Sequence, residues 1–461
     1  MKQPKGSIAI IVLIIGIAVV LAIGALSAYM IKDIKFTQLD EQKLKALNIA
    51  EAGISYMFLY ISEDLKKDNS LQIPYDSTPI SFDSSPSELN VLGGSYHVEC
   101  TKTKTGPYTM PTYIIESEGM EKDGQKRTVR VTIVIPSQYD FIYSVNSLSD
   151  DYKINGITKI IGPFMTKFDL DVSGNANFFA GNPIIVNGNL YLSGSSAIGT
   201  STDRVDLYLG GQYFEKNSVI PLYSMYPKPP DSSSYLFINN FFNKTVTLPD
   251  IAIDPSFYIN SMNGAETVYG LTIYIDGTGK GTFAYKDVNN VIIVTTDPIG
   301  SGFNKLSFSS DKTTLEISGN IIVEGDISIG EKNNDPPIKY SGKGNLFSTG
   351  SIYLNSLVTP KIITSFPATA LLSLISMNNI NFNESGNTSG THDNPDYALV
   401  AISQNLITVQ NYKYIRGNII GGQLDIGNNS TIDFEPNIPS GDLPLPGHFI
   451  LSQKWEEIPN S

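Results

Sequence analysis

The first 66 residues carry a continuous helical pattern. Residues 8–30 form an uncharged, almost wholly apolar run, which at about 1.5 Å per residue is long enough to cross a hydrocarbon layer of about 30 Å. After it, apolar residues recur every three or four positions, at Leu47, Ala50, Ile54, Met57, Ile61 and Leu65. Since neither proline nor a cap signal interrupts residues 8–66, we expect one helix over residues 7–66, transmembrane first and amphipathic afterwards.

Residues 67–136 predict a small antiparallel sheet. After a segment rich in Ser, Pro and Asp, the alternation of Tyr96, Val98 and Cys100 with polar neighbours is typical of a strand. The stretches TYIIES and RTVRVTIVIP continue it, and the pair Asp123-Gly124 between them indicates a hairpin turn. Three strands backed by the amphipathic helix would form an α+β unit.

From residue 137 onward the chain changes to short strands with one apolar face. LEISGNIIVEGDISIG alternates strictly and contains Gly-Asn and Gly-Asp turn pairs, and similar Gly-Asn pairs begin at Gly174, Gly188, Gly319, Gly344 and Gly417. Stacked coils of a right-handed parallel β-helix would bury such faces. Because the spacing is irregular, a β-sandwich is the alternative. We expect a β-helix-like start over 137–204, a strand-rich insertion over 205–310, and a β-helix-like remainder with a proline-rich, extended C-terminal tail over 311–461.

Composition excludes several kinds of chemistry. A formal charge of −13 repels a phosphate backbone, so nucleic acid is not an expected partner. With one cysteine, Cys100, the chain can form no internal disulfide, and its three histidines lie far apart in sequence, which argues against a zinc site. We expect Cys100 to be a buried apolar residue.

Three polar motifs contain residues that could form a site. The glycines of DGTGKG are followed by a strand pattern, so a hairpin turn is favoured over a phosphate loop. HDNPD offers Asp393, Asn394 and Asp396 as calcium ligands, but an Asx-type turn is favoured. Asp169 and Asp171 would share a strand face, as paired carboxylates of a polysaccharide enzyme could, and the acidic group there consists of Asp150, Asp151, Asp169 and Asp171. We expect no catalytic residue, cofactor or metal.

The N-terminus resembles a known family. A basic leader (residues 1–6), Gly6 followed by Ser7, the apolar run, and Ala50-Glu51-Ala52-Gly53 beyond it are similar to the N-terminus of PilX-type minor pilins and of the pseudopilins of type II secretion. The resemblance implies that a peptidase cuts between Gly6 and Ser7, and that the helix first anchors the subunit and later packs among other pilin subunits. Gly53 would be a close-approach point, and Glu51 is either a solvated helix residue or an assembly contact.

The chain departs from the family at Ile11, the fifth residue after the expected cut, where major pilins carry a glutamate. In the family that carboxylate neutralises a neighbour's terminal amine within lipid, where an unpaired charge is costly. The resemblance therefore implies a filament tip or low-copy position for this chain rather than the repeating shaft.

These observations predict a non-enzymatic minor pilin or pseudopilin-like subunit of a type IV pilus or related secretion system, with the β part exposed at the cell surface. The alternative is a membrane-anchored adhesin or polysaccharide-binding protein, and a polysaccharide-active enzyme ranks last. Lysines lie on both sides of the apolar run, so charge does not fix the orientation. The surface-type composition of the β part favours a cytoplasmic N-terminus and an extracytoplasmic C-terminus. Expected partners are membrane lipid, other pilin subunits and a surface glycan or host ligand.

Overall fold

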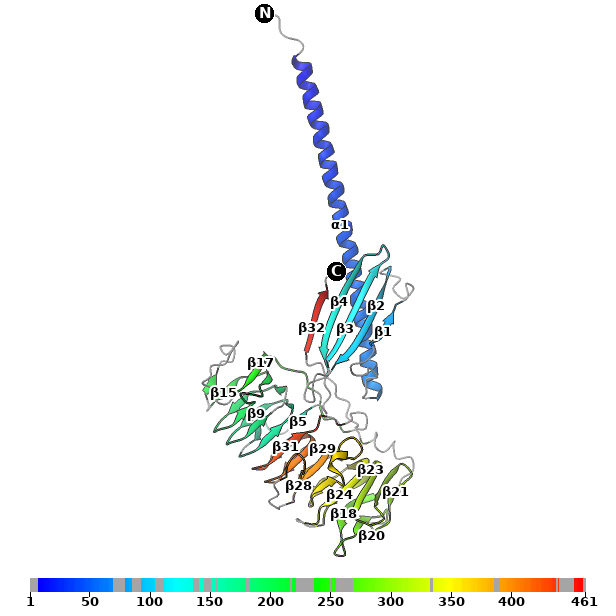
Figure 1. Ribbon diagram of the computed structural model, residues 1–461, viewed down its shortest axis with the longest axis vertical. Coiled ribbons are helices and arrows are strands. Elements are labelled where there is room, and N and C mark those ends of the chain that lie inside the picture. The colour runs from blue at the N-terminus through cyan, green and yellow to red at the C-terminus, as the bar shows by residue number, and fades with distance from the viewer. Residues whose placement is uncertain are drawn as a thin grey trace, which may run out of the picture.

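The chain forms a long helix, a small sheet packed on the second half of that helix, and a large stack of short strands beyond the sheet (Figure 1). The computed structural model describes residues 7–68, 79–84, 93–103, 112–135, 141–144, 151–154, 156–179, 183–215, 218–220, 236–248, 250, 251, 253, 255, 268–331, 335–384, 390–436, 438 and 452–458. Within the helix, side chains are described for residues 19–61.

Helix α1 (Ser7–Asp68) is a single α-helix of 62 residues, about 90 Å long. The uninterrupted pattern predicted this element. Its second half carries the apolar stripe that packs on the sheet, with Ala50, Ile54, Met57 and Ile61 buried there. Among the described residues, no helix combines the length and the apolar character that a bilayer crossing needs.

The small sheet is antiparallel and has five strands in the order β1-β2-β3-β4-β32. Its strands are β1 (Ile80–Asp83), β2 (Gly94–Thr103), β3 (Thr112–Glu121), β4 (Lys126–Val134) and β32 (Ser452–Ile458). The Asp123-Gly124 turn joins β3 to β4, which confirms the predicted hairpin. Cys100 is buried in the core between helix and sheet, and burial raises the pKa of its thiol to about 12.

Strand β32 was not predicted. The C-terminal residues were expected to form an extended tail of the β-helix-like part, but Ser452–Ile458 instead pairs with β4, with Trp455 opposite Val131. The Trp455 ring lies 6.2 Å from that of Phe58 on α1. The stack of strands is therefore an insertion between two neighbouring strands of the small sheet.

The first half of the stack contains β5 to β17. Its strands are β5 (Ile142–Ser144), β6 (Asp151–Ile154), β7 (Lys159–Ile161), β8 (Phe164–Thr166), β9 (Asp169–Val172), β10 (Asn177–Phe179), β11 (Ile184–Val186), β12 (Leu190–Leu192), β13 (Ala197–Ile198), β14 (Val205–Leu209), β15 (Tyr213–Glu215), β16 (Ser218–Ile220) and β17 (Ile238–Asn243). Except for the antiparallel pair β15–β16, these strands pair in parallel with the equivalent strand of the next turn. The ladder continues through residue 205, because β14 pairs with both β11 and β17.

The second half begins with antiparallel hairpins and then becomes parallel. Its elements are β18 (Val268–Ile275), β19 (Gly281–Lys286), β20 (Ile292–Thr295), β21 (Ile299–Ser301), β22 (Asn304–Phe308), β23 (Thr314–Ile329), β24 (Ile338–Ser348), β25 (Ile352–Leu354), β26 (Val358–Pro360), η3 (Ile363–Ser365), β27 (Leu371–Ser376), β28 (Ile380–Phe382), β29 (Tyr397–Val409), β30 (Tyr414–Ile426) and β31 (Thr431–Phe434). From β23 to β31 the pairing between turns is parallel, unlike the antiparallel pairing of the alternative β-sandwich.

The two halves join end to end in an order that differs from the sequence. Strand β31 pairs with β7, and β30 with β5, so the last turn of the second half lies on the first turn of the first half. In Figure 1 the teal β5 accordingly lies beside the red β31. The chain enters the stack at its middle, builds one end, crosses to the other end and returns to the middle. One parallel ladder crosses this seam through Ile322, Phe347, Ile375, Ile402, Ile420, Tyr143, Met165, Ile185, Tyr208 and Phe242.

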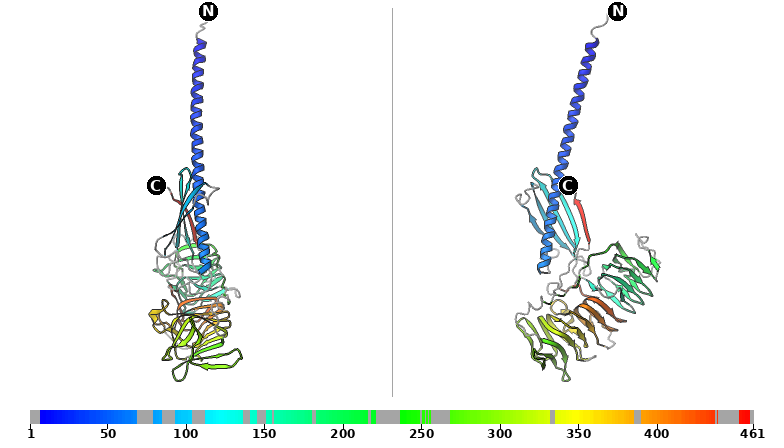
Figure 2. Two further views of the ribbon diagram at one scale, coloured as in Figure 1. Left: turned by 90° about the vertical axis from the view of Figure 1, so that its right-hand side faces the viewer. Right: turned by 180° about the vertical axis from the view of Figure 1, so that it is seen from behind.

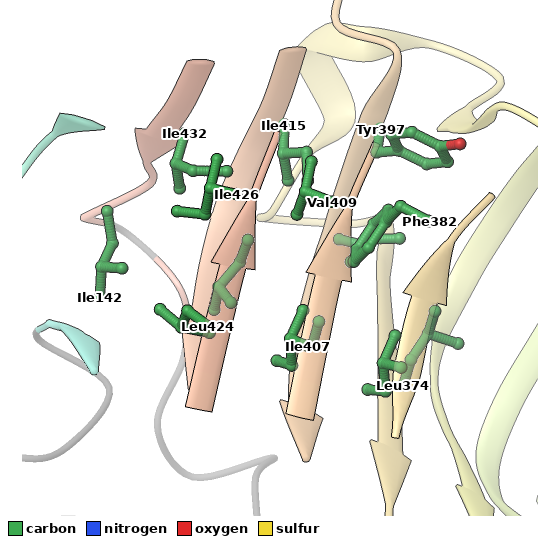
Figure 3. Close-up of a cluster of buried hydrophobic side chains, with 14 of the residues drawn as sticks. Ile142, Leu374, Phe382, Tyr397, Ile407, Val409, Ile415, Leu424, Ile426 and Ile432 are labelled. Carbon is green, nitrogen blue, oxygen red and sulfur yellow. The ribbon is translucent and has the colours of Figure 1, made fainter. Parts of the chain in front are cut away.

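Apolar side chains fill the interior along the whole stack. Figure 3 shows Ile142, from the first strand of the stack in sequence, beside Leu424, Ile426 and Ile432 from its last two strands. These residues belong to one continuous cluster that also includes strands of both distal ends. Turns that would expose an apolar face alone thus cover one another.

Polar side chains repeat at one corner. The hydroxyls of Ser348, Ser376 and Ser403 each donate to a backbone carbonyl, those of Gly325, Gly350 and Asn378, and Ser376 is in register with both other serines. The offset in sequence between paired residues varies from turn to turn, and it is much smaller for Tyr414 and Thr431 than for Val358 and Tyr397. Variable turn length explains why the Gly-Asn pairs are irregularly spaced in the sequence.

Prediction: Gly119→Ala weakens the packing of the helix on the sheet. A Cβ at Gly119 would overlap the carbonyl oxygen of Ala46 and the amide nitrogen of Ala50, and backbone atoms cannot rotate away. We expect a loss of about 1–3 kcal/mol in stability, measured by urea unfolding. In the control Gly277→Ala the added methyl meets nothing within 4 Å, so the same loss in both variants would contradict the contact.

Prediction: Ile432→Ala destabilises the seam. Ile432 is fully buried and in register with Ile160 across the seam, so the truncation should cost about 2–5 kcal/mol. Thermal unfolding should show a lower midpoint for this variant, whereas Val294→Ala, at a side chain that is 62% exposed, should leave the midpoint nearly unchanged. An unchanged midpoint for Ile432→Ala would refute the pairing.

Candidate functional site

Residues 19–36 of α1 present a mostly apolar surface that no other described part of the chain covers. Every side chain described from residue 19 to residue 38 is exposed, although most of them are apolar. Ten large apolar side chains in this stretch are at least half exposed, Val19, Val20, Leu21, Ile23, Leu26, Tyr29, Met30, Ile31, Ile34 and Phe36. They lie on all sides of the helix, which in Figures 1 and 2 projects away from the sheet and the stack. We call residues 19–36 the bare segment.

The predicted leader positions lie at the N-terminal limit of the described residues. Gly6 is outside the described residues, and the backbone helix begins at Ser7. The side chains of Ser7 and Ile11 are likewise outside the described set. Cleavage between Gly6 and Ser7, and the meaning of Ile11, therefore remain predictions.

Glu51 and Gly53 lie where α1 meets the sheet. Glu51 is exposed, and its backbone carbonyl accepts a hydrogen bond from the Ser55 hydroxyl at 2.9 Å. Gly53 is buried, and a Cβ there would meet the side chains of Ser117 and Tyr96. Gly53 thus allows close approach within the chain itself, and an assembly role for either residue stays a prediction.

A group of paired ionisable side chains lies around β30 and β31, near the seam between the two halves of the stack. Lys413 is paired with Glu384, and both are buried. Arg416 donates through Nη2 to Glu435 Oε2 at 2.7 Å, and the Tyr414 hydroxyl donates to Asp433 Oδ2 at 2.5 Å. We call these residues, with His392 and Asp396, the charge cluster.

The HDNPD loop contributes two members of the charge cluster. His392 Nδ1 lies 2.7 Å from Asp433 Oδ2, and Asp396 Oδ2 accepts the backbone N–H of Tyr414 at 2.8 Å. Thr391 and Asn394 exchange backbone hydrogen bonds across the loop, as a turn requires. No group of three or more His, Cys, Asp or Glu side chains suited to a metal ion occurs in the described part of the chain.

Tyr397 adds a buried hydroxyl next to these charges. Among the described residues its hydroxyl has no hydrogen-bond partner, and its ring packs on Phe382 with centroids 4.8 Å apart. Burial first, and then the charges of Glu384 and Asp396, hold the pKa of the Tyr397 phenol well above its usual range. The phenol therefore stays neutral near neutral pH, and its ring contributes to packing with Phe382.

The other polar motifs have structural roles. Asp169 and Asp171 do share the outer face of β9, but Asp169 Oδ1 accepts the backbone N–H of Asn189 at 2.6 Å and so fixes the next turn of the stack. DGTGKG forms the β18–β19 hairpin turn, as predicted. In that turn the Thr278 hydroxyl and the Lys280 backbone donate to Asp276 and lower the pKa of its carboxyl.

Sequence reasoning missed most of the charge cluster. Lys413, Glu384, Asp433 and Glu435 come from three different turns of the stack, and their pairing depends on a register that is not visible in the sequence. In TIDFE the alternation places Asp433 and Glu435 on the face opposite Ile432 and Phe434, so no local signal indicates that both carboxylates are buried. The loop HDNPD drew attention as a ligand set, but its partners could not be identified.

A solved protein structure is similar to this chain at low sequence identity. No family model matches the chain, and no curated protein matches it. Among solved structures, the crystal structure of the competence-associated pilin ComZ from Thermus thermophilus is similar, with a TM-score of 0.45, 12% sequence identity and coverage of 90% of this chain and 98% of that one. At this level the similarity carries no argument about function, which has to come from the residues of the chain itself.

Prediction: Lys413→Met destabilises the stack because it leaves the buried Glu384 carboxylate without this cation. Breaking one side of a buried ion pair costs about 3–5 kcal/mol, so the urea midpoint should fall. The double variant Lys413→Met/Glu384→Leu should regain most of the loss.

The matched variant Tyr397→Phe removes a buried hydroxyl that has no hydrogen-bond partner among the described residues. It should therefore be neutral or slightly stabilising. Equal losses in Lys413→Met and Tyr397→Phe would contradict a pairwise role for Lys413.

Proposed function

We propose that this protein is a non-enzymatic, pilin-like subunit that joins other pilin-type subunits through α1 and presents its β stack outward. The observation that carries the proposal is the bare segment. Lys32, Asp33 and Lys35 lie near the end of the bare segment, but residues 19–31 carry no charged side chain. A helix that is apolar on all sides is stable when other helices or lipid surround it, whereas the second half of α1 already has its own sheet as cover. The partner we assign to the bare segment is therefore the equivalent helix of other subunits.

The N-terminal sequence supports the same assignment. The run of apolar residues extends toward the N-terminus through positions 8–18, preceded by Gly6 and Ser7, where a leader peptidase would cut. Before assembly, this run would hold the subunit in the membrane with its N-terminus in the cytoplasm. With isoleucine at position 11, the mature chain would lack the carboxylate that pairs with a neighbour's terminal amine, which suits a tip or low-copy position.

We also infer that the stack is a parallel β-helix. Parallel registers between successive turns, an interior filled by one apolar cluster, and hydroxyl side chains repeated at one corner all support this architecture. A β-helix grows in length without thickening, so it suits a part that has to project from a filament or cell surface. The charge cluster would then stabilise one edge of the β-helix.

Single-cysteine cross-linking tests the assignment. Cys100 is buried and its thiol pKa is raised to about 12, so the native cysteine stays protonated and silent at neutral pH. Leu26→Cys, in the bare segment, should give oxidised dimers and adducts with other pilin-type subunits in intact cells. Lys280→Cys, on the exposed β18–β19 turn, should give none, and mass spectrometry should find a mature N-terminus at Ser7.

Two outcomes would separate the parts of the proposal. If no position from 19 to 36 forms a cross-link in cells that make the filament, then the bare segment is a plain anchor and the pilin assignment fails. If cross-links form but the chain retains Met1, then assembly stands and the leader cleavage is wrong.

A further inference from the structure

A groove lies at the end of the stack that is farthest from the N-terminus of α1. It is formed by the β18–β19 hairpin, β20 and the second half of β23, which lie at the lower end of the molecule in Figure 1 and in both views of Figure 2. Its volume is about 630 Å³, within the range of about 300–1,000 Å³ that is usual for ligand sites. Neither pilin assembly nor the charge cluster uses this surface.

The floor of the groove is the outer face of a three-stranded sheet. Strand β18 pairs with β19 on one side and with β23 on the other, so side chains in register lie in rows across the face. One row contains Lys286, Tyr269 and Glu324. The other row contains Ala284, Thr272 and Ser328. The Tyr269 ring, between the opposite charges of Lys286 and Glu324, therefore lies beside a row of small side chains that includes two hydroxyl groups.

Local backbone features keep this floor open and fixed. Gly270, with φ +61°, lies at a break in register between β18 and β23, and the glycine adds no side chain to the centre of the groove. Asp326, which also lines the groove, accepts the Ser351 backbone N–H on Oδ1 at 2.7 Å. The carboxylate is therefore held in place before any ligand arrives.

The rim opposite Glu324 and Asp326 is a rigid turn with apolar neighbours. Asp287 accepts the backbone N–H groups of Asn289 and Val291, each at 2.9 Å, and this turn presents Asn290 to the groove. Ile292 on β20 also lines the groove and is 67% exposed. The rim thus adds an amide and an apolar side chain to the tyrosine and carboxylates of the floor.

We propose that this groove binds a glycan chain that carries no net negative charge. A sugar ring has an apolar C–H face and a rim of hydroxyls, which match an aromatic ring such as that of Tyr269 flanked by carboxylate, amide and hydroxyl groups. Two carboxylates, Glu324 and Asp326, face one cation, Lys286, so uronic-acid, sulfated or phosphorylated chains are disfavoured.

An extended peptide fits the groove less well than a glycan does. Peptides commonly bind to sheets by adding a strand to a free edge, but both edges of β18 are already paired, and the ligand would lie across the sheet face. Hydrogen bonds from the floor would have to come from side chains, as they do in sugar recognition. The proposal goes beyond subunit assembly and does not depend on it.

Binding of the purified full-length chain to an oligosaccharide array tests the proposal. The array should contain neutral cello-, manno- and chito-oligosaccharides, amine-bearing chitosan oligomers, and acidic alginate and heparin fragments. We expect retention on neutral or amine-bearing chains and none on the acidic ones. Tyr269→Ala should weaken the affinity for the best neutral oligosaccharide at least about tenfold, as measured by calorimetry.

The matched control is Tyr274→Ala. Tyr274 is on the same strand and half-buried but does not line the groove, so its affinity should stay within about twofold of the parent. Unfolding midpoints of both variants report whether each one is folded. Glu324→Gln should weaken binding of chitosan oligomers more than that of neutral chains.

Three results would overturn the proposal. They are the absence of retention on every neutral and amine-bearing glycan, equal weakening by Tyr269→Ala and Tyr274→Ala, and Tyr269-dependent binding to a peptide array in place of glycans. Because the assay uses purified protein, its failure would leave the cross-linking test of assembly unaffected. Failure of cross-linking would equally leave glycan binding intact.

Discussion

The stack depends on the parallel pairing between β31 and β7 and between β30 and β5. Without this seam, each half would expose the apolar face of its innermost turn to water, which would destabilise the stack. The seam joins Thr431 to Lys159, residues that are separated by most of the stack in sequence. Closing such a long loop costs conformational entropy, and the apolar surface that the two halves bury against each other at the seam has to offset this cost.

The features that could be predicted from the sequence are local ones. The helix follows from an uninterrupted pattern, the β3–β4 hairpin from Asp123-Gly124, and the β18–β19 turn from DGTGKG, because each is decided by residues close in sequence. The pairing of β32 with β4 and the contact of Lys413 with Glu384 are decided by register between distant segments. The order of turns was equally hidden, since a chain that starts at the middle of a stack has the same alternation as one that starts at its end.

The candidate sites follow the same division. Residues 8–30 were identified as apolar from composition alone, whereas their lack of cover over residues 19–36 required the structure. Tyr269, Lys286 and Glu324 had no signal in the sequence, because a half-buried tyrosine and exposed charged residues on outer strand faces look like ordinary alternation. Their common row exists because β18 pairs on both sides, and the bulge at Gly270 has no counterpart in any motif.

The position of the stack within the small sheet has a mechanical consequence. Val134 at the end of β4 pairs with Ser452 at the start of β32. The chain therefore leaves for the stack and returns from it at the same end of these two neighbouring strands. Two covalent connections, one from β4 and one to β32, restrict rotation of the stack about the helix axis more than a single connection would. Tension on the stack acts on the ends of both strands, and the share that acts on β32 is carried to the sheet by its hydrogen bonds with β4. Chain topology thus limits the orientations that the stack can take relative to α1 and the small sheet.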